Sequence, residues 1–477
     1  MPAPGPETAM AEFETRLAAV LARCVPGFER LLRAERLSGG ASQETYRIEL
    51  ETHGAPLTLA MRRAPGGATS KPDPARPGLT AEAKLFQVAR AAGVPEPEIV
   101  HVLEPEDGLG LGFIMQWLDG ETLGSRILRA PELAEIRPRL AYQCGQILAR
   151  IHAIDPAATG LDQELQTVSA EQFVRRMWDQ YRGYETPQPM IDYAARWLLD
   201  HLPAGQRRTL VHNDFRLGNL MVTPAGVTAV LDWEGAHIGD PVRDLGWICT
   251  NSWRYGNTAL PVGGIGTRED LLAGYRDVSG IAIDPEHVRF WEVFGSFWWA
   301  IGCLTMAQGW RHGPDPSVER PGIARRSSEC QVDCVNLLIP GPVGLVAEGA
   351  PLSSTDIPDV DELLRSVRDF LRDDARPALA GRNGFLALVA ANSLDIVRRE
   401  LALAPAHLAG ERARLEALLG KTGDLTELRW RLTHALRDGS MPLDAPGLAD
   451  HLRTTAVNQL AIDQPKYSGL ATALAET

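Results

Sequence analysis

Lysine is scarce in this chain. Of the 48 lysines and arginines among its 477 residues, only four are lysines. A site that would ordinarily hold an anion with a lysine must therefore use an arginine here, or be absent. The four lysines are Lys71, Lys84, Lys421 and Lys466.

A surplus of positive charge is also missing, because the formal net charge is −13 at pH 7. Nucleic acids and anionic membranes attract basic surfaces, so this balance argues against either as a main partner. It does not exclude an anionic substrate, which needs only a local basic site.

Cysteine pairs of the zinc-binding kind are absent. The chain has six cysteines and no C-x-x-C pair, and Cys330 and Cys334, four residues apart, lack partners for a zinc site. We therefore expect reduced thiols and a cytoplasmic location. The other cysteines are Cys24, Cys144, Cys249 and Cys303.

Hydrophobic runs long enough to span a membrane are not evident either. The first residues, MPAPGPETAMAEFETR, have neither a basic start nor an apolar core, so no signal peptide is evident. The stretch FWEVFGSFWWAIGCLTMAQGW is interrupted by Glu292 and predicts a buried helix. The length is enough for two or three globular domains.

What the chain does have is a dense group of polar residues between positions 210 and 244, LVHNDFRLGNLMVTPAGVTAVLDWEGAHIGDPVRD. Asp214 stands two residues after His212, Asn219 follows five residues later, and Asp232 ends an apolar run. This layout predicts phosphoryl transfer. One carboxylate can take a proton from a hydroxyl, while an amide oxygen and a second carboxylate can hold magnesium.

The pattern around these residues predicts a β-hairpin. Residues 220–222 and 227–231 are short apolar strands, and 223–226 form a turn. The hairpin would place Asn219 just before its first strand and Asp232 just after its second, so both could face one metal–phosphate cluster. The alternative is a polar loop whose side chains only satisfy backbone groups.

The stretch resembles the aminoglycoside phosphotransferase family. HNDFRLGNLM and VLDWEGAHIGDPVRDLGW resemble the branch that occurs alone in bacteria or fused to acyl-CoA dehydrogenases. The resemblance implies an α+β, two-lobed, protein-kinase-like fold that uses ATP and Mg²⁺. It also implies Asp214 as catalytic base, Arg216 as a phosphate contact, and Asn219 and Asp232 as magnesium ligands.

An arginine occupies the position of the kinase phosphate lysine. In kinases the strand after a glycine-rich loop carries V-A-I-K, and here L-A-M-R ends at Arg62. Arg63 should point to the opposite face of the strand. Gly39, Gly40 and Ser42 form the preceding glycine turn, whose backbone amides could approach phosphate, although such a turn can also be only a turn.

Three further nucleotide-site residues follow from the resemblance. Glu82 lies in the first turn of a predicted helix and is expected to pair with Arg62. The strand that ends near Gln116 and Leu118 corresponds to the hinge, where backbone groups bind adenine.

Residues downstream of the catalytic stretch suggest further roles. Asp240 and Asp244 are expected to brace the loop. Trp253 and Arg254 lie in a string similar to one in the resembling branch, and are candidates for stacking and anion contact with the substrate, although core packing is an equally good interpretation.

The second half of the chain predicts an additional domain. A Pro/Gly break near residue 340 precedes leucine-rich helical patterns without a catalytic cluster, which resemble a small helical domain of unknown function. Dimerisation or partner docking is its expected role. The predicted organisation is an N-terminal ATP-binding lobe with a leading helix (1–116), a catalytic lobe (117–340), a linker (341–358) and an all-α domain (359–477).

The leading hypothesis is an ATP-dependent O-phosphotransferase acting on a small hydroxylated molecule. The dehydrogenase-linked branch suggests a hydroxyacyl-CoA or related hydroxy acid, and an acyl-CoA dehydrogenase as a partner. An amino alcohol or aminoglycoside is the alternative substrate. A nucleotide-binding pseudokinase scaffold is the alternative of another class. A protein kinase is disfavoured because no long substrate-binding loop or A-P-E string follows Asp232.

Overall fold

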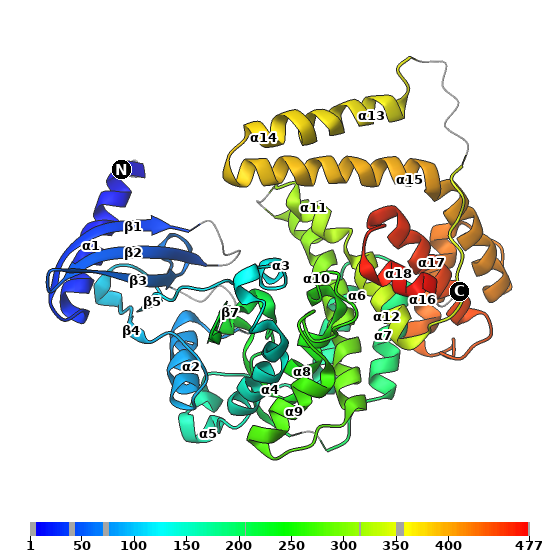
Figure 1. Ribbon diagram of the computed structural model, residues 1–477. Coiled ribbons are helices and arrows are strands. Elements are labelled where there is room, and N and C mark those ends of the chain that lie inside the picture. The colour runs from blue at the N-terminus through cyan, green and yellow to red at the C-terminus, as the bar shows by residue number, and fades with distance from the viewer. Residues whose placement is uncertain are drawn as a thin grey trace. The chain divides into compact units, whose positions relative to one another are not determined.

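The computed structural model consists of two compact units (Figure 1). The first unit contains Met1–Val168, Gly205–Cys249 and Leu260–Asp284, and the second contains Ser169–Ala204, Thr250–Ala259 and Pro285–Thr477. Within these spans the described residues are 6–37, 43–69, 76–205, 207–313, 316–349 and 357–475.

The first unit begins with helix α1 (Pro6–Cys24) and an antiparallel sheet of five strands in the order β1-β2-β3-β5-β4. Burial in β2 alternates along the strand, as expected when one face covers a core. The strands are β1 (Phe28–Arg36), β2 (Glu44–Thr52), β3 (Ala55–Arg63), β4 (Ile99–Val102) and β5 (Gly112–Gln116).

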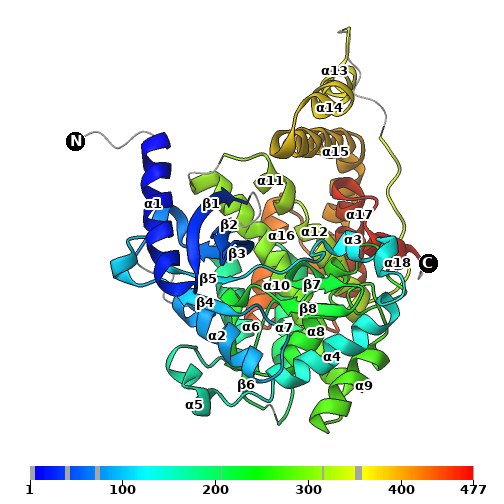
Figure 2. The same cartoon turned by 60° about the vertical axis from the view of Figure 1, so that its left-hand side comes forward.

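Helix α1 covers one face of this sheet, as Figure 2 also shows. Phe13 and Leu17 of α1 share one apolar core with Ile48 of β2 and Met61 of β3. The guanidinium of Arg63 lies on this face, 4.4 Å above the ring of Phe13. The predicted opposite orientations of Arg62 and Arg63 are therefore confirmed.

Helix α2 (Leu79–Ala91) packs on the other face. Phe86 of α2 contacts Phe113 of β5, with ring centroids 5.7 Å apart. Because Arg62 points to this face, it meets Glu82 in the first turn of α2. Because successive side chains of β3 point to opposite faces of the sheet, Arg62 reaches α2 and Arg63 does not.

The rest of the first unit carries the predicted hairpin. Leu220 of β7 pairs with Val230 of β8 in antiparallel register, so the hairpin prediction is confirmed. The elements are β6 (Thr209–Val211), β7 (Leu220–Thr223), β8 (Gly226–Val230), β9 (His237–Gly239), α3 (Gly124–Ile127), α4 (Leu140–Ile151), α5 (Pro156–Thr159), α8 (Val242–Cys249) and α9 (Arg268–Ser279).

The second unit is helical throughout its described elements. The apolar stretch around Glu292 forms the buried part of α10, as predicted. Among the described residues, no helix combines the length and apolarity needed to cross a membrane. The helices are α6 (Ala170–Arg182), α7 (Pro189–Asp200), α10 (Pro285–His312), α11 (Glu319–Ala324), α12 (Ser327–Leu338), α13 (Val360–Asp369), α14 (Arg376–Ala378), α15 (Gly381–Leu419), α16 (Leu425–Asp438), α17 (Leu448–Asp463) and α18 (Ser468–Ala475).

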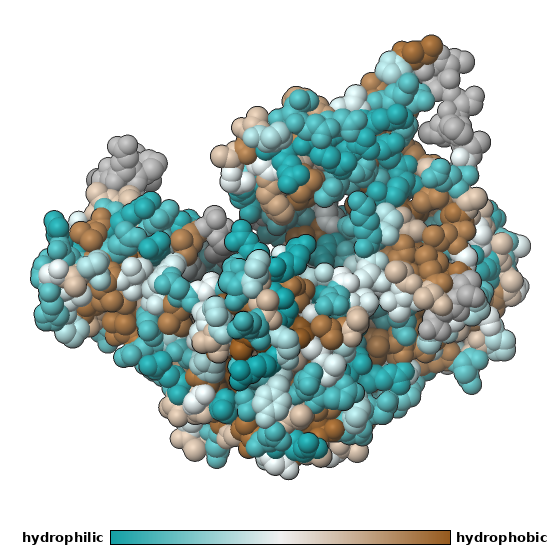
Figure 3. Space-filling model, in the orientation of Figure 1, coloured by the Kyte–Doolittle hydropathy of each residue, from teal (hydrophilic) through white to brown (hydrophobic). Residues whose placement is uncertain are grey.

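Helices α13 and α15 form a hairpin held by ion pairs. Asp395 of α15 accepts hydrogen bonds from Arg368 at 3.0 Å and from Arg372 at 2.6 Å. The face of this hairpin seen in Figure 3 is mostly hydrophilic. Pro405 lies inside α15, and Figure 1 shows the two halves of the helix running in different directions, as expected where a proline removes a backbone hydrogen bond.

The C-terminal helices dock on α7 through a buried ion pair. Arg437 of α16 donates from Nε to Asp192 of α7 at 2.8 Å, and the Asp192 side chain is fully buried. Trp178 and Tyr181 of α6 also donate to this carboxylate, at 2.7 and 3.0 Å. Burial raises the pKa of Asp192, while these donors oppose the rise. Helix α16 therefore shares one core with α6 and α7.

Substitution of Arg437 by alanine is expected to lower the free energy of unfolding of this unit by about 3 kcal/mol or more, because Asp192 would stay buried without its cation. Urea unfolding followed by circular dichroism measures the change. Arg431→Ala is the matched control on the same helix, since its exposed pair with Glu427 should contribute less than about 0.5 kcal/mol. Equal effects of the two substitutions would contradict a docking role for Arg437.

Candidate active site

His212 links the loop that carries Asp214 to Leu231, the residue before Asp232. His212 is fully buried, with Nε2 3.2 Å from the carbonyl oxygen of Leu231 and Nδ1 accepting from the backbone N–H of Asp214 at 3.2 Å. Nε2 therefore carries the proton. Burial lowers the pKa of His212, which agrees with a neutral ring. The ring sets the spacing between the two predicted functional aspartates.

Asp214 is held by three side chains. Its Oδ1 accepts from Nε of Arg216 at 3.0 Å and from Nε1 of Trp247 at 2.7 Å, and its Oδ2 accepts from Nδ2 of Asn219 at 2.6 Å. A carboxylate oxygen offers two acceptor positions. Oδ1 is thus saturated, while Oδ2 keeps one position for a substrate hydroxyl.

Asn219 and Asp232 flank the hairpin as predicted. The Leu231 N–H donates to the carbonyl oxygen of Asn219 at 2.8 Å, which joins the start of β7 to the end of β8. Because Nδ2 of Asn219 is committed to Asp214, its Oδ1 is left as the possible metal ligand. Asp232 has a left-handed backbone, with φ 69°, an uncommon conformation that often occurs at functional sites.

Arg62 joins the predicted nucleotide and metal residues. Its Nη2 donates to Oδ1 of Asp232 at 2.7 Å and lies 3.7 Å from Glu234, and its Nε is 3.4 Å from Glu82. The expected Arg62–Glu82 pair is present, but 3.4 Å is too long for a strong hydrogen bond. The shorter contact is with Asp232.

Glu82 is almost completely enclosed, with a side chain 3% exposed. Burial raises its pKa to about 7, against the favourable charge of Arg62, and the carboxylates of Asp232 and Glu234 raise it further. Arg62 thus faces three carboxylates, of which Glu234 is also paired with Arg76 at 3.2 Å. A cation or a metal-bound phosphate next to Asp232 would relieve this excess of negative charge.

The donor set fits magnesium bound together with a nucleotide. Within the described part of the chain, no group of three or more His, Cys, Asp or Glu side chains could hold a metal by itself. Magnesium is commonly bound through one or two protein oxygens and completed by substrate phosphates and water. Asn219 Oδ1 and the Asp232 carboxylate suffice for that arrangement.

The other residues predicted to bind the nucleotide are those of the glycine turn and of the hinge. Gly39, Gly40 and Ser42 lie outside the described residues. Gln116 ends β5, and its N–H donates to the Glu98 carbonyl at 2.8 Å. Gln116 and half-buried Leu118 line an open hollow of about 970 Å³, but Arg62, Asp214 and Asp232 are not among its lining residues. That hollow is therefore separate from the catalytic cluster.

Trp253 and Arg254, the candidate substrate residues, belong to the second unit. Nη2 of Arg254 donates to Glu292 at 2.6 Å, and the Glu292 side chain is 2% exposed. The ring of Trp253 packs at 5.6 Å from that of Trp299. Both residues are built into helix packing, and the charge of Arg254 is balanced by Glu292.

Asp244 braces the catalytic loop in the way the sequence suggests. This fully buried carboxylate accepts the backbone N–H groups of His212 at 2.8 Å and Asn213 at 2.7 Å, and it lies 3.1 Å from Nε2 of His152. These bonds hold its pKa below the ordinary value despite burial. Asp240 accepts from the N–H of Val242 at 3.1 Å, at the start of α8.

Trp247 is a residue of the candidate site that the sequence interpretation missed. Its indole N–H orients Asp214, and its ring lies 4.7 Å below the guanidinium of the buried Arg243. The only signal available was its position on the helix that begins after GDPxxD. That position does not reveal that the side chain returns to the catalytic carboxylate.

His212 should make folding stability depend on pH. A histidine with a lowered pKa binds fewer protons when folded, so stability falls as the pH drops below the unfolded pKa near 6.5, by up to about 1.4 kcal/mol per pH unit. His212→Phe should flatten the decline between pH 6.5 and 5 in urea unfolding. His312→Gln, at an exposed position, should leave the slope unchanged. An unchanged slope in His212→Phe would contradict a neutral His212.

The cluster around Asp214 and the sheet that carries Arg62 agree with a kinase-like phosphotransferase. The sequence model of the phosphotransferase enzyme family (APH) matches residues 33–281, and the chain belongs to this family. A domain of unknown function, DUF6285, matches residues 377–467. The predicted family and enzyme class, a phosphotransferase with an alcohol group as acceptor, are thereby confirmed.

Named relatives and a solved structure agree with this assignment. A mouse protein, acyl-CoA dehydrogenase family member 10, is 35% identical over 219 residues, which cover 44% of this chain and 19% of that protein. A chicken protein, acyl-CoA dehydrogenase family member 11, is 30% identical over 308 residues, covering 58% of this chain and 37% of that protein. The chain thus spans between a fifth and two fifths of these curated relatives.

The solved structure is from Ralstonia eutropha and is provisionally described as an aminoglycoside phosphotransferase. It is 25% identical, with a TM-score of 0.54, over 66% of this chain and 95% of its own. The predicted fold, a kinase-like α+β arrangement followed by a helical C-terminal region, is confirmed.

Proposed function

We propose that this protein transfers the γ-phosphoryl group of ATP, with Mg²⁺, to a hydroxyl of a hydroxyacyl-CoA or related hydroxy acid. The observation that carries the reaction type is the Asp214 carboxylate, held by Trp247, Arg216 and Asn219 with one acceptor position left on Oδ2. The acyl-CoA part rests on the names of the curated relatives, which contain the words acyl-CoA dehydrogenase.

In the proposed reaction, the free acceptor position on Asp214 Oδ2 receives the substrate hydroxyl and its proton. The hydroxyl oxygen bonds to the γ-phosphorus, the bond from that phosphorus to the ADP oxygen breaks, and ADP leaves. Arg216 and Arg62 supply positive charge beside the phosphates. A magnesium ion on Asn219 and Asp232 would neutralise phosphate charge, which is its usual part in phosphoryl transfer.

The nucleotide is proposed to lie against Gly39, Gly40 and Ser42, with adenine at the backbone of Gln116 and Leu118. Glu82 would hold Arg62 in place. Binding would exchange the present Arg62–Asp232 contact for contacts with phosphate and metal. This exchange agrees with the two carboxylates, Glu82 and Asp232, that Arg62 faces in addition to Glu234, which Arg76 also pairs.

Trp253 and Arg254 are proposed as additional substrate contacts, beside the main contact with Asp214. Because Glu292 balances Arg254, an acyl-CoA phosphate would have to share that guanidinium. We further propose that the enzyme is cytoplasmic and forms a homodimer. Its helical domain is proposed to dock to an acyl-CoA dehydrogenase. The domain boundaries 1–116, 117–340, 341–358 and 359–477 are part of this proposal.

The acceptor is tested by ADP release from Mg-ATP with 3- and 4-hydroxyacyl-CoAs, choline and aminoglycosides. We expect release with at least one hydroxyacyl-CoA and none when Asp214 is replaced by alanine. Release with choline or an aminoglycoside alone would favour the alternative substrates. Nucleotide binding without turnover on any acceptor would favour a pseudokinase scaffold, which the presence of Asp214, Asn219 and Asp232 argues against.

A further inference from the structure

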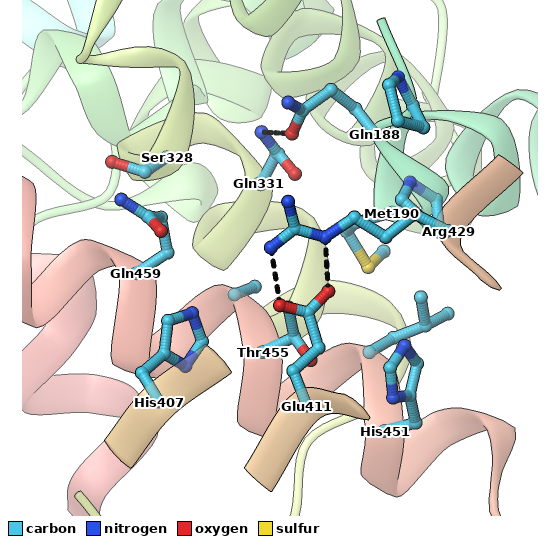
Figure 4. A pocket seen from close by; sticks show the side chains of 14 residues that line it. Gln188, Met190, Ser328, Gln331, His407, Glu411, Arg429, His451, Thr455 and Gln459 are labelled. Carbon is cyan, nitrogen blue, oxygen red and sulfur yellow. Dashed lines mark hydrogen bonds and ion pairs between the residues drawn. The ribbon is translucent and has the colours of Figure 1, made fainter. Parts of the chain in front are cut away.

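A cavity of about 120 Å³ lies within the second unit, and none of the residues proposed for catalysis lines it. The starts of α7 and α12 form one wall, and α15, α16 and α17 form the other. Figure 4 shows Arg429 extending into it between Gln331 and Glu411. A cavity needs about 10–15 Å³ of such volume for one water, so this one has room for a small ligand.

Its walls present buried polar atoms without partners. His407 and His451 are each 1% exposed, and Nε2 of His407 and Nδ1 of His451 have no hydrogen-bond partner. Nε of Arg414, next to the cavity wall, is likewise unsatisfied. Each such group costs about 1–3 kcal/mol when left unpaired. The cavity therefore favours an occupant that forms hydrogen bonds.

The carboxylate in the cavity is already neutralised. Glu411 receives two parallel hydrogen bonds from Arg429, at 2.7 and 2.5 Å, and Figure 4 shows both. The nearby Asp450 is mostly exposed and paired with Arg453 at 3.3 Å. Neither carboxylate is left to balance a further positive charge.

The remaining charge is positive. Arg414 donates to Thr455, a neutral group that lines the cavity, at 3.2 Å. Burial lowers the pKa of His407, and lowers that of His451 to about 4, against the opposing charge of Glu411. Both rings are neutral at pH 7. Glu411 and Asp450 are the acidic groups that act on Arg414, and each is paired with another arginine, so among the described residues Arg414 has no ion pair of its own. The α7 and α12 residues that line the cavity carry no charge.

We propose that this cavity binds a small oxyanion, a carboxylate or a phosphate, between Arg429, Thr455 and the two histidines. The anion balances the charge of Arg414 and gives the ring nitrogens a partner. A metal ion does not fit, because no group of three or more His, Cys, Asp or Glu side chains among the described residues could hold one. Since the site joins α12 to α15–α17, binding also stabilises their docking.

The test is calorimetric titration of the full chain at pH 7 with sodium acetate and with sodium phosphate, against sodium chloride at equal ionic strength. We expect saturable binding at one site for at least one oxyanion, and an unfolding temperature that rises with its concentration. Which anion binds distinguishes a carboxylate from a phosphate. No saturable binding of either would mean that water fills the cavity, and would overturn the proposal.

Paired substitutions locate the binding. Glu411→Gln with Arg429→Gln removes both charges while two amides can still pair, and it should weaken binding at least tenfold. Arg412→Gln with Glu416→Gln, an exposed pair on the same helix α15, is the matched control and should bind as the wild type does. Thr455→Leu, which keeps the charges but fills space, should also weaken binding. Unchanged affinity in the first and third variants would place the anion elsewhere and refute the site.

Proton uptake gives a readout that a merely structural cavity would not show. An anion beside His407 and His451 should favour their protonated forms, so binding at pH 6 should take up protons. Titration in two buffers of different ionisation enthalpy measures the number taken up. Binding without proton uptake at pH 6 would contradict an anion seated against these histidines.

Discussion

Replacement of Asp214 by alanine is expected to lower kcat by a factor on the order of 10²–10⁴, the usual contribution of a positioned general base. The carboxylate is the one group in the catalytic loop that is oriented by Trp247, Arg216 and Asn219 at once. Without it, the substrate hydroxyl has neither an acceptor for its proton nor a partner that fixes its approach. Steady-state ADP release with the best acceptor measures the effect.

Two comparisons separate chemistry from folding in this experiment. Asp162→Ala, at an exposed position in the same unit, should retain full activity. The Asp214 variant should still bind Mg-ATP, because Arg62 and Asp232 are unchanged. Trp247→Phe should give a smaller loss in kcat, since it removes one of the three donors to Asp214. Turnover of the alanine variant within threefold of the wild type would show that Asp214 is not the base.

Asp232→Asn is expected to weaken the apparent affinity for magnesium by more than the roughly 10–100-fold that follows the loss of a group hydrogen-bonded to a metal ligand, with a comparable loss in kcat/KM. Asparagine has the same shape and tolerates the left-handed backbone at φ 69°, so strain does not confuse the result. The amide cannot neutralise either a divalent cation or Arg62, whose shortest contact here is with Asp232. Magnesium titrations of the rate at fixed ATP measure the change.

The control for this substitution is Glu234→Gln. Glu234 also faces Arg62, at 3.7 Å, but it is not predicted to bind metal. It should therefore leave the magnesium dependence close to that of the wild type. If the two substitutions shifted the magnesium requirement equally, Asp232 would act through Arg62 alone and not as a ligand.

The family resemblance implied the kinase-like fold, and local sequence patterns predicted several of its elements. The apolar runs on both sides of residues 223–226 are short and bounded by turn formers, a pattern that predicts a hairpin, and β7 and β8 form one. Strand alternation likewise separated Arg62 from Arg63. These features follow from backbone geometry within a few residues, which is why the sequence was sufficient for them.

The roles that depend on distant contacts could not be predicted in this way. Trp247 reaches Asp214 across 33 residues, and Arg437 reaches Asp192 across 245, so no spacing rule links them. For the same reason the sequence suggested a separate C-terminal helical domain, but not that its helix α16 shares a core with α6 and α7.

The sequence by itself determined the reaction class, because Asp214, Asn219 and Asp232 stand at a spacing that the hairpin converts into a single cluster. Only the tertiary structure decided which oxygen of Asp214 is available, that Arg62 bonds Asp232 more closely than Glu82, and that a cavity lined by His407, Arg429 and His451 lies between the C-terminal helices. The physical reason is that hydrogen-bond partners and desolvation are properties of packed neighbours. The sequence specifies which groups are present, and folding decides which of them come into contact in the buried interior.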